Sequence, residues 1–142
     1  MVQAHTTNQA SPFAGVALRY PEKTFYLGQV FKDTTNSYKP VWFLAILSLL
    51  KRGEQRSFLL ADLFTEMAVA AWHSVCLYRL SLGHQDKLQN ALLDIKQISG
   101  LAPNAPPDAI RKLVDGSPAA QAKLEYFERY VAGEEPERAR RR

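Results

Sequence analysis

The feature that most constrains the fold is the apolar run VWFLAILSLL, from Val41 to Leu50. It lies inside a predicted helix over 38–51, because residues 33–37 (DTTNS) are all good N-cap types and Pro40 fits a first helical turn. Since this helix is apolar on nearly every side, we expect it at the centre of a bundle rather than at its surface. The run is too short to cross a bilayer, which takes about 20 residues, so we expect no membrane partner.

Four further helices are predicted, each bounded by helix-breaking segments: residues 60–80, 87–99, 107–114 and 118–131. Gly83 and Gly100 end helices in the left-handed conformation open to glycine, and Asp86 caps the helix that follows it. Earlier in the chain, Thr24–Phe31 alternates enough for either a short strand or an extended lead-in. The predicted fold class is therefore all-α, a single-domain bundle of about five helices with at most one short strand near its start.

Composition supports one such domain. The 142 residues are 46% hydrophobic and 11% aromatic, enough for one sizeable core. Residues 1–24 are predicted to be a flexible arm, residues 25–132 the helical domain, and residues 133–142 a charged tail with a basic end. The shared helix faces predict these buried side chains: Trp42, Phe43, Ile46, Leu63, Met67, Trp72, Cys76, Leu88, Leu92 and Ile95.

Charge and cysteine content indicate the class of partner and the cellular compartment. The net charge of +4 suits a polyanionic partner, although the excess is modest. Cys76 is the only cysteine, so no internal disulfide can form, and we expect a reducing, cytoplasmic location. The first residues lack a charged segment followed by an apolar one, so secretion is not expected.

Residues 71–88 (AWHSVCLYRLSLGHQDKL) collect reactive residue types without forming a site. Cys76 lies in mid-helix among apolar neighbours, where nothing favours a thiolate, and His73 lacks an orienting third group. His73 and His84 are separated by a helix end, and no second spaced pair of metal ligands accompanies them. No phosphate-loop, dinucleotide, zincin or nucleophile-elbow motif occurs. We therefore expect no metal, no cofactor and no enzymatic activity of the chain on its own.

Two segments, residues 30–47 (VFKDTTNSYKPVWFLAIL) and residues 67–88 (MAVAAWHSVCLYRLSLGHQDKL), resemble the N-terminal helical region of bacterial proteins that contain an HNH endonuclease domain. The similarity extends over roughly residues 25–131. In that family the chemistry belongs to a downstream ββα-metal motif, whereas this chain has no histidine after His84, so no catalytic residue carries over. The resemblance implies a non-catalytic helical module of a bacterial defence or mobile-element system, associated with an HNH nuclease.

Two functions remain open at this stage. In the first, the module binds DNA or RNA through phosphate contacts, with aromatic and amide side chains at bases or sugars. The candidate residues are Lys32, Asn36, Tyr38, Lys39, Lys51, Arg52, Arg56 and Lys87.

In the second, the chain is a protein-interaction or oligomerisation module without nucleic-acid contact, whose partner is an HNH nuclease or another complex subunit. The candidate contact residues are His84, Gln85, Tyr126 and Tyr130. The sequence leaves sequence specificity and oligomeric state open.

Overall fold

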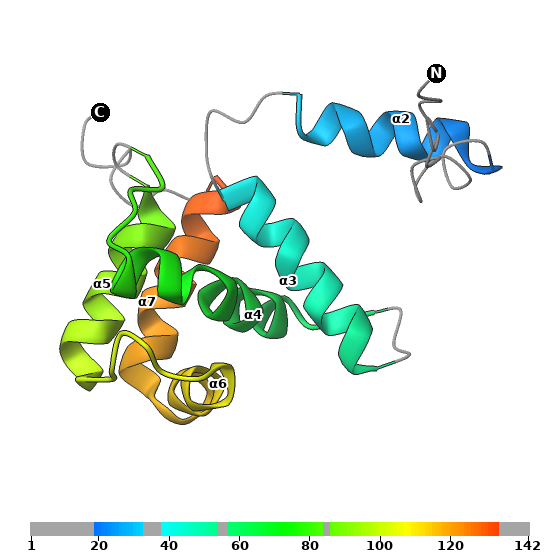
Figure 1. The fold of residues 1–142 in the computed structure, drawn as a ribbon. Helices are drawn as coiled ribbons and strands as arrows, with labels where there is room; N and C mark the ends of the chain where they lie inside the picture. Colours follow the sequence, from blue (N-terminus) through cyan, green and yellow to red (C-terminus); the bar gives the residue numbers. More distant parts are fainter. Residues whose placement is uncertain (1–18, 33–37, 54–56, 84–85, 134–142) are drawn as a thin grey trace, which may run out of the picture. The chain divides into compact units, whose positions relative to one another are not determined.

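The structure, a computed structural model, describes residues 19–32, 38–53, 57–83 and 86–133 (Figure 1). Within these ranges every element is helical and none is a strand, so the predicted all-α class is confirmed. Contacts divide the chain into two compact units, residues 1–34 and residues 35–142.

The first unit contains helix α2, Pro21–Val30, so the predicted strand or extended lead-in over 24–31 is wrong. Pro21 at the first helical position and the acidic Glu22 in the first turn both favour a helix start. Thr24 adds a side-chain hydrogen bond of 2.9 Å to the carbonyl oxygen of Tyr20. The apparent alternation is misleading, because the turn of α2 spreads these apolar side chains around the helix and none is buried.

The second unit is a bundle of five α-helices and one π-helix within its described part. The helices are α3 (Tyr38–Arg52), α4 (Leu60–Trp72), η1 (His73–Leu77), α5 (Lys87–Ser99), α6 (Pro107–Gly116) and α7 (Pro118–Val131). The capping residues act as predicted at α5, where the Asp86 carboxylate accepts the Gln89 backbone N–H at 2.9 Å and Gly100 ends the helix at φ 65°.

The predicted helix over 60–80 is shorter than expected, and its last part is a π-helix rather than an α-helix. After Trp72 the chain forms the π-helix η1, in which the Tyr78 N–H bonds to the carbonyl oxygen of His73 at 2.9 Å. The chain then leaves the helix at Arg79, a non-glycine residue with φ 54°. Side chains anchor the junction, because the Trp72 indole N–H donates to the Ala102 carbonyl at 3.3 Å.

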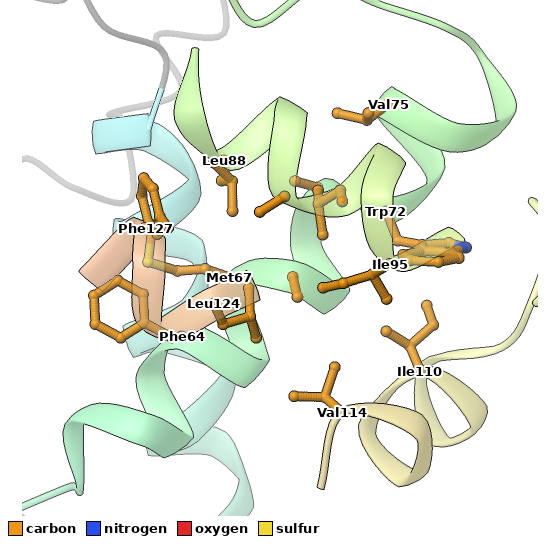
Figure 2. Close-up of a cluster of buried hydrophobic side chains, with 14 of the residues drawn as sticks. Phe64, Met67, Trp72, Val75, Leu88, Ile95, Ile110, Val114, Leu124 and Phe127 are labelled. Carbon is orange, nitrogen blue, oxygen red and sulfur yellow. The ribbon is translucent and has the colours of Figure 1, made fainter. Parts of the chain in front are cut away.

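Helix α4 and η1 form the middle of the core. Figure 2 shows side chains from α4, η1, α5, α6 and α7 meeting there. Trp72 is fully buried, and the rings of Phe64 and Phe127 meet edge to face with their centres 5.4 Å apart. By length and composition the 60–77 segment could cross a membrane, yet half of it is buried inside the bundle, as in the core helix of a folded domain. Six predicted core residues are confirmed as buried: Met67, Trp72, Cys76, Leu88, Leu92 and Ile95.

Helix α3 does not occupy the predicted central place. It packs mainly against α4, at the edge of the bundle (Figure 1), and buries only Val41, Ala45 and Leu49. The prediction that Trp42 is buried is wrong, since 37% of it is exposed, while Phe43, Ile46 and Leu63 are half-buried. An apolar pattern on every side shows that a helix can be covered, but it does not show which face a neighbour covers.

Candidate interaction surfaces

A buried carboxylate joins three helices of the bundle. Glu66 on α4 is 2% exposed and accepts hydrogen bonds from Ser48 Oγ at 2.7 Å and Arg52 Nη1 at 2.5 Å, both on α3. Arg111 on α6 binds the same carboxylate with two nitrogens, Nε at 2.5 Å and Nη2 at 3.0 Å. Arg111 also pairs with Asp108 at 2.7 Å. A charge buried this deeply is tolerated only because it is paired and fully hydrogen-bonded.

The electrostatics of this cluster favour ionised Glu66. Burial by itself would raise the pKa of Glu66, but the hydrogen bonds from Arg111 and Ser48 and the charges of Arg111 and Arg52 outweigh it, so the pKa is lowered. Arg52, a candidate phosphate contact, is therefore committed to an internal ion pair. Glu66 was not among the residues predicted from the sequence, although a single acid within the apolar stretch 63–72 signals a buried charge that needs partners.

A cationic and aromatic cluster lies between α5 and α7. The Lys87 ammonium lies 5.8 Å from the ring centre of Tyr126 and 5.6 Å from that of Tyr130. Cations at this distance from aromatic faces interact favourably. The structure thus brings together a residue assigned to nucleic-acid contact and two assigned to protein contact. Beside them lies a cavity of about 520 Å³, whose lining includes Lys123, paired with Asp94 at 2.8 Å.

Of the other candidate residues in the second unit, Tyr38 and Lys39 line one hollow, whose lining does not include Lys51. The rings of the half-buried Tyr38 and of Phe127 meet edge to face, with their centres 6.5 Å apart. Lys51 is exposed at the end of α3. Lys32 belongs to the first unit, and Lys39 is half-buried on α3. Four candidates lie outside the described residues: Asn36, Arg56, His84 and Gln85.

An apolar groove opens where α3, α4 and the end of α7 meet. Its volume is about 350 Å³ and most of its lining is apolar, including Trp42, Leu60, Met67 and Val131. Trp42, Leu60 and Val131 are 37%, 52% and 46% exposed, so large apolar side chains surround an open hollow. Elsewhere on α3, Leu44, Leu47 and Leu50 are exposed to solvent.

His73 and Cys76, both on η1, have structural partners. Cys76 is 2% exposed and burial raises the pKa of its thiol, although the charge of Lys96 opposes part of the rise. His73 Nε2 lies 2.9 Å from the Ala105 carbonyl oxygen, which fixes the proline-rich connector against η1. Over the described ranges, no group of three or more His, Cys, Asp or Glu side chains could hold a metal ion.

Comparison of the chain with protein-family models, with curated proteins and with solved structures finds no match.

Proposed function

We propose that the helical domain is a non-catalytic protein-interaction module that docks a helix of a partner protein. The apolar groove between α3, α4 and α7 carries this proposal. An apolar hollow rimmed by exposed apolar side chains is typical of a protein-interaction site. The outer face of α3 extends the argument, because a helix that is apolar on all sides is normally covered on all sides.

The groove favours an amphipathic helix as the partner segment. Such helices place apolar side chains at three- and four-residue spacing into hollows of this kind. The resemblance to the helical region of HNH-containing proteins suggests which complex the module joins, a cytoplasmic nucleic-acid-processing assembly of a bacterial defence or mobile-element system. In this proposal the nuclease chemistry belongs to the partner.

Site-specific cross-linking in the native host tests the proposal. A photoreactive amino acid at Leu60 should cross-link to an apolar, helix-forming segment of one protein, and Val131→Glu should abolish the product because it places a charge in the groove. Leu93, 41% exposed on α5 and outside the groove, provides the matched control position for both the probe and the glutamate. The proposal fails if Leu60 yields no product that Leu93 lacks, or if Val131→Glu leaves that product unchanged.

Nucleic-acid binding is a second candidate, and the Lys87–Tyr126–Tyr130 cluster favours it. A cation beside aromatic rings suits a phosphate and a stacked base. Titration with DNA and RNA at low salt should then show weaker binding for Lys87→Ala, with an affinity that falls with salt by a logarithmic slope of about −0.9 per duplex phosphate contact. DNA should stay intact with Mg²⁺ or Mn²⁺, and absence of binding at low salt would eliminate this candidate.

A further inference from the structure

The cavity beside Lys87 and Tyr126, here called the α5–α7 hollow, lies between two helices that face each other with small side chains. Ala91 of α5 and Ala122 of α7 both belong to its lining. Because both are alanine, neither side chain fills the space between the helices. The resulting volume of about 520 Å³ lies within the range of about 300–1,000 Å³ that is usual for ligand sites.

The lining of the α5–α7 hollow provides an aromatic ring, an amide and a cation. Tyr126 contributes ring surface and is 39% exposed, and the exposed Asn90 offers an amide donor and acceptor. The Lys87 ammonium makes no ion pair with a carboxylate in the described part of the chain, so its charge can serve an anion. The other two charged residues of the lining, Lys123 and Asp94, pair with each other.

These groups match the parts of one unpaired nucleotide. An aromatic side chain stacks on the face of a base, an amide binds the edge of a base, and a lysine pairs with a phosphate. A base inside a duplex has both faces covered by its neighbours, so it cannot stack on Tyr126. The site therefore fits a single strand, whose bases can turn outward into a hollow.

We propose that the α5–α7 hollow binds single-stranded nucleic acid by taking up one base, which stacks on Tyr126 while Lys87 pairs with the phosphate of that nucleotide. This inference rests on the second candidate function, nucleic-acid binding, and narrows it to single strands. Tyr126 and Tyr130, at 5.8 Å and 5.6 Å from the Lys87 ammonium, hold this cation in place before a ligand arrives. Such preorganisation reduces the entropy that Lys87 loses on binding.

Fluorescence anisotropy of a labelled thymidine oligonucleotide, titrated at low salt with the full-length protein, tests the proposal. The single strand should bind at least about tenfold more tightly than the same strand paired with its complement, because only the single strand offers an unstacked base. Tyr126→Ala should weaken single-strand binding about tenfold, the loss expected when a stacking ring is removed. Tyr126→Phe keeps the ring and should bind like wild type.

Ala122→Leu separates the uptake of a base from phosphate binding at the surface. Ala122 is exposed on α7, so leucine, a good helix former, should leave the fold intact while it fills the hollow. Affinity for the single strand should fall about tenfold, whereas affinity for the duplex should not change. Ala119→Leu is the matched control, since Ala119 is exposed on the same helix outside the lining, and this variant should bind like wild type.

The possible contrary results distinguish this inference from the function on which it rests. Equal affinities for single strand and duplex, both lowered by Lys87→Ala, would overturn the uptake of a base but support nucleic-acid binding by the cluster. An Ala122→Leu protein that binds the single strand as tightly as wild type would overturn the inference in the same way. Absence of binding to both probes would overturn this inference together with the second candidate function.

Discussion

Replacing Glu66 with Gln tests the central ion-pair cluster. The substitution keeps the shape of the side chain but removes the charge that two arginines and one serine share. Arg52, with 55% of its side chain exposed, can return to water when its partner is lost. Arg111 cannot do so to the same extent, because only 18% of its side chain is exposed.

The structure sets the size of the expected loss. Removing one partner of a buried ion pair costs about 3–5 kcal/mol, since the other charge stays buried and uncompensated. Arg111 keeps its pair with Asp108, so the lower end applies and Glu66→Gln should lower the free energy of unfolding by about 3 kcal/mol at pH 7. Asp108→Asn is the matched control: the Asp108 side chain is 96% exposed, so losing its pair with Arg111 and its charge in the first turn of α6 should cost at most about 1 kcal/mol.

The effect of Glu66→Gln should depend on pH in one direction. The pKa of Glu66 lies below its ordinary value of 4.5 in the folded protein, so its ionised form stabilises the fold at all pH values above that ordinary value. That contribution is lost as the pH falls below 4.5 and through the folded-state pKa. The stability gap between wild type and Glu66→Gln should therefore narrow under acid conditions.

Urea unfolding followed by tryptophan fluorescence measures both effects. With a slope of about 2 kcal/mol per molar urea, the midpoint for Glu66→Gln should fall by about 1.5 M at pH 7. A variant as stable as wild type at pH 7 would refute the buried-charge argument. A gap that stays constant from pH 7 to pH 3 would refute the assignment of the stabilisation to ionised Glu66.

Three further predictions concern side chains of the second unit. Trp72→Ala should lower the free energy of unfolding by about 3–5 kcal/mol because Trp72 is fully buried, whereas Trp42→Ala should lower it less because Trp42 is 37% exposed. Urea unfolding of both variants measures the two losses, and equal losses would contradict the prediction. Arg79→Gly should stabilise the protein by about 0.5 kcal/mol and raise its melting temperature. The strain of the left-handed backbone in the folded state, which glycine relieves, exceeds the added backbone entropy that glycine gives the unfolded state. A lower melting temperature would contradict this prediction. Cys76 should react slowly with a thiol reagent at pH 8 and rapidly in urea, because it is buried with a raised pKa; equal rates would show that the thiol is accessible in the native state.

The candidate residues were only partly predictable from the sequence. The sequence identifies lysines and tyrosines as candidate contact residues from their residue type alone. Its periodicity does not show that Lys87 meets Tyr126 and Tyr130 across two helices. Nor does it show that Arg52 is committed to Glu66. The acid within an apolar helix is visible in the sequence, but its partner Arg111 is 45 residues away, and long-range pairing depends on how the helices pack.

Local chemistry let the sequence alone determine the helical class and several helix ends. Asp86 caps α5 and Gly100 terminates it because capping and left-handed turns involve only neighbouring residues. Tertiary structure decided what depends on neighbours distant in the chain: that α4 rather than α3 is central, and that Trp42 borders an open groove. An apolar helix such as α3 satisfies the same local pattern at the centre or at the edge of a bundle, and only the packing of the other helices determines which of its faces remains uncovered.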